Sequence, residues 1–253
     1  MKRTISKNKY IVLNENVSAD IRLFCFPFAG GGASVFSKWS EELGHVFEVA
    51  SIQLPGRETR IMEDPHTSME DLIPMLAEDI KPYLDKKFIF FGHSMGTLIA
   101  FELSRFLEKI YNIKPLHLFL SSCGHPAQEQ LSTPIHNLPY EEFVEELKRR
   151  NGTHQEVFDN KELLSLMLPY IRADFQICET YQYYSAEKLL VPITVLGGNE
   201  DYDVKNSDLE RWGNETLGSF EKKIFSGDHF YLQKESKQSL QSFLIEQAKY
   251  YKF

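Results

Sequence analysis

The segment from residue 88 to residue 96 constrains the fold of this chain more than any other. An apolar run, residues 88–91, leads directly into G-H-S-M-G at residues 92–96, which matches the pattern G-x-S-x-G. A helical pattern follows at once, so Ser94 is expected on a tight turn between a strand and a helix. Gly92 and Gly96 would avoid side-chain clashes in that turn. The prediction is a Ser94 hydroxyl exposed above a sheet, with a helix N-terminus beneath it.

Short β-rich apolar runs alternate with helical patterns along most of the chain. Helical spacing of apolar residues is found over 68–84 and 95–110. Strands that look buried on both faces are expected over residues 21–26, 47–54, 88–91, 116–121, 191–196 and 220–225. This alternation predicts an α/β fold, with a mainly parallel central sheet and flanking helices. In such folds, ligands bind at the carboxyl ends of the strands.

The alternation is interrupted between about residues 125 and 187. Two helical patterns, 140–150 and 161–184, lie in this segment, and no convincing strand does. Its many large apolar residues must cover either the core or an apolar substrate channel. We therefore expect one α/β domain, residues 1–253, with a helical lid inserted at about 125–187.

A serine nucleophile needs a histidine base, which in turn needs an acid to fix its tautomer. The sequence has eight histidines. His229 follows the last expected strand and precedes a C-terminal helical pattern, which is where this architecture would deliver a base. His93 adjoins the serine and should point away from it. Less suitable positions, in loops, polar stretches or a strand, are those of His45, His66, His117, His136 and His154.

The acid is expected in the loop after the strand at 191–196, which offers Glu200, Asp201 and Asp203. Asp201 is preferred and Asp203 is its competitor, whereas the longer side chain of Glu200 is less easily fixed. The strand at 116–121 is followed by no acid before Glu129, which excludes an acid from that position. The expected order is then Ser, Asp, His, with His229 last.

Two backbone N–H groups should stabilise the negative charge of a tetrahedral intermediate. One is expected from Met95, directly after the serine, and the other from Ala29 in the glycine-rich stretch 26–32. This stretch contains neither G-x-G-x-x-G nor the Lys and Ser/Thr of a Walker loop, which disfavours nucleotide binding.

Charge and composition narrow the possible partners. Lysine and arginine total 28 against 36 acids, a net charge of −8, which argues against binding nucleic acid or an anionic membrane. The apolar runs fall short of the roughly 20 residues that span a bilayer, and the first residues lack a signal-peptide pattern, so a cytoplasmic protein is expected. Cys25, Cys123 and Cys178 are expected as buried, reduced thiols rather than a disulfide or a metal site.

Five motifs together resemble the type II thioesterases that accompany nonribosomal peptide and polyketide synthetases. They are F-P-F-A-G-G at 26–31, L-P-G-R-E at 54–58, G-H-S-M-G at 92–96, L-P-Y-I-R-A-D-F at 168–175 and G-D-H-F-Y-L at 227–232. The resemblance covers nearly the whole chain and implies the α/β-hydrolase fold. It places the family's triad on Ser94, Asp201 and His229, and its oxyanion amides on Met95 and Ala29. Asn199-Glu200 departs from the family pattern directly before the acid, so Asp203 stays open as the alternative acid. The segment 54–60 matches a family motif, but the residues themselves indicate no role for it.

The resemblance implies an enzyme that removes unwanted acyl groups from the phosphopantetheine arm of carrier-protein domains. No cofactor or metal is expected beyond that arm, and the protein is expected to be a monomer. Carrier domains are commonly acidic, so a chain at −8 would need a local basic patch near the lid, for which Lys148, Arg149 and Arg150 are candidates.

Three alternatives remain at this stage. A medium-chain acyl thioesterase of fatty-acid synthesis or a carboxylesterase for small esters would use the same triad with a different acyl pocket. A non-catalytic, hydrolase-like binding protein would lack a triad member, and this sequence can supply all three.

Overall fold

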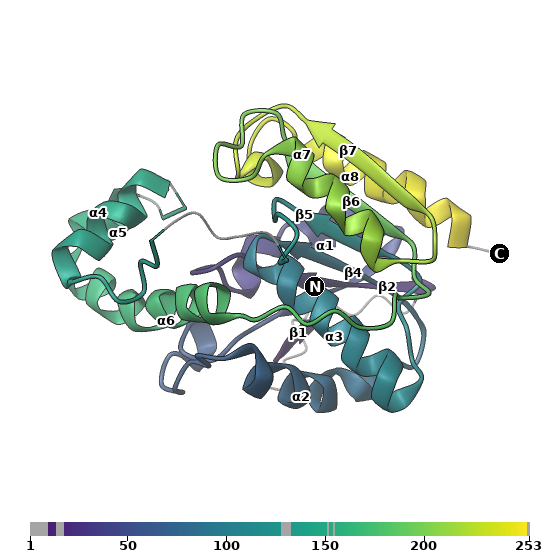
Figure 1. Cartoon of the computed structure of the whole chain (residues 1–253), viewed down its shortest axis with the longest axis horizontal. Coiled ribbons are helices and arrows are strands. Elements are labelled where there is room, and N and C mark those ends of the chain that lie inside the picture. The colour runs from purple at the N-terminus through teal and green to yellow at the C-terminus, as the bar shows by residue number, and fades with distance from the viewer. Residues whose placement is uncertain (1–9, 14–17, 128–132, 151, 154, 252–253) are drawn as a thin grey trace.

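A seven-stranded sheet forms the centre of the protein (Figure 1). The structure is a computed structural model that describes residues 10–13, 18–127, 133–150, 152–153 and 155–251. The strand order is β1-β3-β2-β4-β5-β6-β7, and only β1 runs antiparallel to its neighbour. The strands are β1 (Ile11–Leu13), β2 (Ile21–Phe26), β3 (Phe47–Ile52), β4 (Lys87–His93), β5 (Leu118–Ser121), β6 (Ile193–Gly198) and β7 (Phe220–Phe225).

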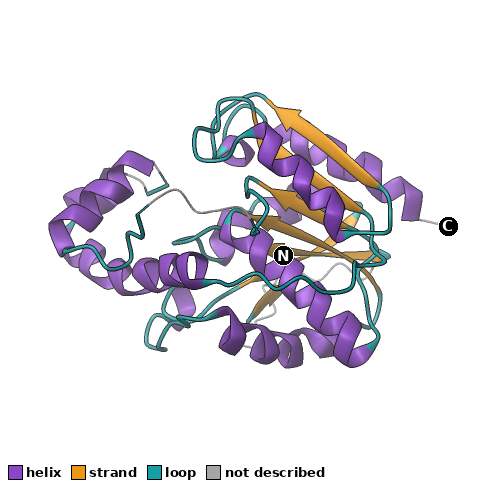
Figure 2. Cartoon of the chain, in the orientation of Figure 1, coloured by secondary structure: helices purple, strands orange, loops and turns teal. Residues whose placement is uncertain are grey.

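Helices cover both faces of this sheet (Figure 2). Successive side chains of a strand point to opposite faces, so Phe24 and Phe26 pack on one side while Leu23 and Cys25 pack on the other. The first face carries α2 (Met69–Ile80) and α3 (Met95–Tyr111), and the second carries α1 (Trp39–Leu43) and α8 (Lys237–Ala248). The predicted α/β class and mainly parallel sheet are therefore confirmed.

Three further helices form the insertion expected at about 125–187. They are α4 (Tyr140–Arg150), α5 (Gln155–Asp159) and α6 (Lys161–Thr180), which project beyond the sheet at the left of Figure 1. The insertion has its own apolar cluster, which includes Phe143, Leu147 and Leu168. Asn160 caps the start of α6 by accepting a hydrogen bond from the Leu163 amide at 3.1 Å. The chain leaves α6 in an extended conformation at Tyr181, earlier than the helical pattern to residue 184 indicated.

Short turns of helix complete the connections. They are α7 (Asn206–Leu209) and the 3-10 turns Ala33–Phe36, Glu58–Arg60, Lys81–Tyr83, Glu210–Glu215, Tyr231–Gln233 and Lys249–Tyr251. In the described part of the chain, no helix combines the length and the apolarity needed to cross a bilayer.

The structure differs from the predicted strands at several places, and β3, β5 and β6 are each shorter by two residues at one end than predicted. β4 and β6 extend through glycines that the sequence marked as turns, because Gly92 pairs with Leu120 and Gly198 with Phe225. The three-residue strand β1 was not predicted, since it is too short to show a pattern. Burial on both faces is wrong for β7, which lies at the edge of the sheet and is exposed over its first four residues.

The parallel strands bring their carboxyl ends to one edge of the sheet. The loops that start there are residues 27–32 after β2, Ser94 after β4, 122–125 after β5, 199–204 after β6 and 226–230 after β7. Every residue that the sequence assigned to catalysis lies in one of these loops or directly after Ser94. This edge is therefore where a site can assemble.

We expect Phe91→Ala to lower the free energy of unfolding by about 3–5 kcal/mol. The Phe91 ring is fully buried, with its centroid 5.0 Å from that of Trp39 and 6.1 Å from that of Phe36. Phe220→Ala is the matched control, because Phe220 is 37% exposed on β7 and its loss should cost less than about 1 kcal/mol. Urea unfolding followed by circular dichroism measures both, and equal losses would contradict the packing described.

Candidate active site

Ser94 occupies a strained turn between β4 and α3. Its backbone angles are φ 54° and ψ −118°, an unfavourable combination for a residue with a side chain. The turn is held by a hydrogen bond from the Ser94 amide to the Ser121 carbonyl at 2.8 Å and by one from the Thr97 amide to the Ser94 carbonyl at 2.9 Å. The strain is therefore fixed by neighbouring β5 and by the first turn of α3.

Gly92 and Gly96 allow this turn because main chains meet at both positions. A Cβ atom on Gly92 would lie 2.2 Å from the Gly96 carbonyl oxygen, and one on Gly96 would lie 2.1 Å from the Phe26 carbonyl oxygen. No side chain fits at such distances. The start of α3 thus lies directly against the end of β2.

His229 and Asp201 are hydrogen-bonded to each other, with 2.9 Å between His229 Nδ1 and Asp201 Oδ2. The Asp201 side chain is 1% exposed and that of His229 is 15% exposed. The other carboxylate oxygen, Oδ1, accepts hydrogen bonds from the amides of Asp203 at 3.0 Å and Val204 at 3.1 Å. Asp201 is therefore held on both oxygens and fixes the orientation of the imidazole.

The two other acids of this loop have different surroundings. The Asp203 side chain is 39% exposed, and its nearest cationic partner is Arg150 at 3.9 Å. Glu200 is exposed and contributes its backbone amide to the Gly227 carbonyl at 2.9 Å. The geometry favours Asp201 over both as the partner of His229.

Asp201, Asp203 and His229 also form the one group, within the described residues, whose ligand atoms could surround a metal ion. These atoms lie within 4.8 Å of one another. Both oxygens of Asp201 already accept hydrogen bonds, and one of them faces His229. The arrangement fits an imidazole–carboxylate pair better than a metal centre.

Asn199 joins the acid loop to the histidine loop. Its Oδ1 accepts a hydrogen bond from the Gly227 amide at 2.9 Å, and its own amide donates to the Phe225 carbonyl at 2.9 Å. The two loops approach so closely that a Cβ atom on Gly198 would lie 2.3 Å from the Gly227 carbonyl oxygen. The departure from the family pattern at Asn199 thus has a structural role.

His93 lies beneath the site and is fully buried. Its Nδ1 is 2.8 Å from Ser121 Oγ, which in turn is 2.7 Å from the Tyr231 hydroxyl. Burial, and then the charge of nearby His229, hold the pKa of His93 well below its ordinary range. His93 is therefore a neutral neighbour of His229, whose ring centroid is 5.2 Å away.

A cavity of about 450 Å³ lies over these residues. Ser94, His229, Met95 and Ala29 all line it, so the structure brings these predicted residues to one space. Apolar side chains from α3 and from the insertion form much of the wall, namely Leu98, Leu147, Ile171 and Phe175. The insertion therefore contributes part of the wall of this cavity.

His125 is the second histidine of the cavity. Its Nε2 is 2.9 Å from Glu215 Oε1, and its Nδ1 accepts a hydrogen bond from the Ala127 amide at 3.2 Å. Both ring nitrogens are engaged, which leaves His229 as the better placed base.

The cysteines differ in part from the expectation. Within the described residues none of the three forms a disulfide, and Cys25 is buried as predicted. Cys123 and Cys178 are only partly buried and line the cavity. Burial, followed by the negative charge of Asp201, raises the pKa of Cys123 to about 12. Cys123 is thus a protonated wall residue and not a competing thiolate nucleophile.

The segment 54–60, to which the residues alone gave no role, is largely buried. The Arg57 side chain is 2% exposed and forms an ion pair with Asp174 of α6. Local sequence pattern does not reveal this pair, because the two residues are far apart in the sequence. Arg57 and Asp174 both lie within motifs of the family resemblance, and this was the feature of the sequence that could have pointed to them.

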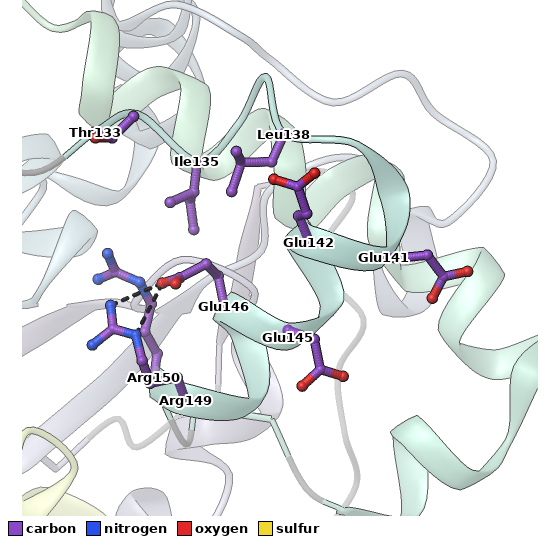
Figure 3. A pocket seen from close by; sticks show the side chains of 9 residues that line it. All are labelled: Thr133, Ile135, Leu138, Glu141, Glu142, Glu145, Glu146, Arg149 and Arg150. Atoms are coloured by element: carbon purple, nitrogen blue, oxygen red, sulfur yellow. Dashed lines mark hydrogen bonds and ion pairs between the residues drawn. The ribbon is translucent and has the colours of Figure 1, made fainter.

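A second cavity, of about 600 Å³, lies on the insertion and is lined by neither Ser94 nor His229 (Figure 3). Glutamates of α4 and the side chains of Ile135, Leu138 and Arg149 line it. Arg149 pairs with Glu146 at 2.8 Å, and Lys148 pairs with Glu145 at 2.7 Å. Two of the three cations expected in a basic patch are therefore neutralised on their own helix. Arg150 lines this cavity and also the cavity above Ser94.

Comparisons with known proteins identify the family of this chain. A family model described as a thioesterase domain matches residues 21–247. The chain is 43% identical over 243 residues to the gramicidin S biosynthesis protein GrsT of Aneurinibacillus migulanus, covering 96% of this chain and 94% of that protein. It is 36% identical over 215 residues to the thioesterase PikA5 of Streptomyces venezuelae, covering 84% and 75% respectively.

Solved structures show the same likeness. The type II thioesterase BorB from the borrelidin biosynthetic cluster superimposes with a TM-score of 0.84 at 30% identity, covering 95% of this chain and 96% of that one. The resemblance found in the motifs is thereby confirmed. This chain belongs to the thioesterase family, and it is a hydrolase of thioesters built on the α/β-hydrolase fold.

Proposed function

We propose that this thioesterase removes acyl groups from the phosphopantetheine arm of carrier-protein domains, with Ser94, His229 and Asp201 as its catalytic triad. The observation that carries the triad is the hydrogen bond between His229 Nδ1 and Asp201, at 2.9 Å, at the edge of the cavity that Ser94 lines. With Nδ1 bonded to the carboxylate, Nε2 is the nitrogen left to take a proton from the serine.

The first half of the reaction forms an acyl-enzyme. Ser94 Oγ attacks the thioester carbonyl carbon while His229 accepts the hydroxyl proton, and Asp201 stabilises the imidazolium that results. The tetrahedral intermediate then collapses, the C–S bond breaks, and His229 returns the proton to the departing thiol. In the second half, His229 activates a water molecule that releases the acid and regenerates Ser94.

The amides of Met95 and Ala29 are the proposed donors to the oxyanion. Met95 begins α3, and the first amides of a helix have no partner within it. Ala29 lies in the loop after β2, against which α3 is packed at Gly96. Both residues line the cavity with Ser94, so their amides can meet a carbonyl oxygen bound there.

The relatives support a carrier-bound substrate. GrsT is named for gramicidin S biosynthesis, and BorB for the borrelidin cluster. The phosphopantetheine belongs to the partner, so no resident cofactor is required by this reaction. Of the cations expected to meet an acidic carrier, Arg150 is the one whose side chain lines the cavity, 3.9 Å from Asp203.

We expect Ser94→Ala to reduce the hydrolysis rate by about 10⁴-fold or more while leaving the fold intact. Labelling with a fluorophosphonate probe should occur in the wild-type protein and disappear in the variant. Melting temperatures of the two proteins provide the control for folding. Turnover by the variant within tenfold of wild type would exclude Ser94 as the nucleophile.

Asp201→Asn should lower kcat by about 10²- to 10⁴-fold, because the amide favours the wrong tautomer of His229. Asp203→Asn is the matched control in the same loop, and it should lower kcat by less than about tenfold. Steady-state kinetics on one thioester substrate measure both. A larger loss from the Asp203 variant would reverse the assignment.

The leaving group should determine the rate. Contacts with the carrier body lie far from the reacting carbonyl, and their binding energy can align the thioester with Ser94. We expect kcat/KM to fall from acyl-carrier to acyl-coenzyme A to a simple oxygen ester, each tested with matched acetyl and longer chains. Equal values for carrier and coenzyme A would leave a general thioesterase, such as one of fatty-acid synthesis. Faster hydrolysis of the oxygen ester would favour a carboxylesterase.

A further inference from the structure

The ion pair between Arg57 and Asp174 is the most completely buried one among the described side chains, which are 2% and 1% exposed. It is bidentate, with Arg57 Nη1 2.5 Å from Asp174 Oδ2 and Nη2 2.7 Å from Oδ1. The guanidinium also lies 4.7 Å from the centre of the Tyr170 ring. Burial of two charges is costly, so this pair needs every hydrogen bond around it to be satisfied.

Both members of the pair also bind the loop that carries Ala29. Arg57 Nη1 donates to the Gly31 carbonyl at 3.0 Å, and Asp174 Oδ2 accepts from the Gly30 amide at 2.8 Å. These charge-assisted bonds are stronger than bonds between neutral groups. The pair therefore fixes two consecutive glycines whose backbone would otherwise be free to rotate.

The orientation of the Ala29 amide follows from the next bond in the chain. The Gly31 amide donates to the Phe28 carbonyl at 2.8 Å. In a trans peptide, the Phe28 carbonyl and the Ala29 N–H point in opposite directions. Arg57 holds Gly31, and Gly31 in turn fixes the direction of the Phe28 carbonyl. Because the Ala29 N–H belongs to the same peptide group, its direction is fixed as well.

Helix α6 adds a second restraint to the same loop. Gly30 has φ +82°, and a Cβ atom there would lie 3.3 Å from the Ile171 side chain. Ile171 and Phe175 line the cavity, and Asp174 lies between them on the helix. One helix therefore forms part of the cavity wall and also holds the loop of the proposed oxyanion donor.

We propose that Arg57 and Asp174 are positioning residues that aim the Ala29 amide at the developing oxyanion. This inference rests on the proposed function, because it takes Ala29 as an oxyanion donor. Its specific consequence is that loss of the pair weakens binding of the tetrahedral state and leaves binding of the ground state unchanged.

The decisive variant is Arg57→Met combined with Asp174→Leu, which removes both charges and leaves neither orphaned. With an acyl-coenzyme A as substrate, we expect kcat to fall about 10- to 100-fold and KM to stay within about threefold of the wild-type value. This fall in kcat is smaller than the full loss caused by removing one oxyanion donor. Arg57→Lys keeps the charge but cannot reach both Asp174 oxygens and the Gly31 carbonyl, so it should give a smaller loss in the same direction. If the double variant does not fold, the kcat and KM of Arg57→Lys test the inference in its place.

Two inhibitors separate positioning from general structure. An alkyl trifluoromethyl ketone forms a tetrahedral adduct with a serine hydroxyl, whereas a coenzyme A thioether of equal chain length has a methylene group in place of the thioester carbonyl. Affinity for the ketone should fall in parallel with kcat, and affinity for the thioether should stay within about threefold. A parallel loss of thioether affinity, or unchanged ketone affinity in a folded variant, would overturn the inference.

The matched control is Arg60→Met combined with Glu63→Leu. Arg60 comes from the same segment and is also buried, but it pairs with Glu63 at 2.7 Å and lies over the Tyr10 ring. This control variant should keep kcat within about twofold of the wild-type value.

If the ketone forms no adduct with Ser94 in the wild-type protein, the proposed function itself fails. Inhibition of the wild type, with equal inhibition of the double variant, refutes only the positioning role.

Discussion

The contact between the start of α3 and the end of β2 is the constraint on which the site depends. At Gly96 the two main chains are so close that a Cβ atom would lie 2.1 Å from the Phe26 carbonyl oxygen. This contact sets Ser94, at the N-terminus of α3, beside the loop that carries Ala29. A side chain at this position would separate the nucleophilic turn from that loop, and the two amides proposed for the oxyanion could no longer face one point.

The remaining loops are fixed mainly by one another. Asn199 accepts a hydrogen bond from Gly227, which joins the loop of Asp201 to the loop of His229. Ser121 connects the main chain at Ser94 with the side chains of His93 and Tyr231. Loops held in this way need little rearrangement during a reaction, and such preorganisation is the main source of electrostatic stabilisation in enzymes.

The insertion is joined to this network through charge as well as apolar packing. Its own apolar cluster holds α4 and α6 together, while Asp174 extends from α6 to the glycines after β2. The charges of α4 are arranged differently, since Lys148 and Arg149 pair within their own helix. Arg150, at the end of that helix, is left to face the cavity. The insertion thus contributes part of the cavity wall, a support for the loop of Ala29 and one cation, Arg150, that lines the cavity.

Local pattern was sufficient for much of the fold and for where the candidate site lies. The run into G-H-S-M-G defined the turn at Ser94, and apolar spacing located α3, α4 and β2 close to their observed bounds, because these features depend on neighbouring residues. The same rules missed the glycine-containing ends of β4 and β6, where pairing with a neighbouring strand overrides the local preference for a turn.

The sequence by itself determined the fold class, the strained serine turn and the loops from which an acid and a base could come. Only the tertiary structure decided that Asp201, and not Asp203, is hydrogen-bonded to His229, because the two acids differ in burial and not in type. It also gave segment 54–60 its role, since Arg57 is separated from Asp174 by 117 positions along the chain. A pair so distant in sequence leaves no periodic signal, and its geometry exists only when the sheet and the inserted helix have packed together.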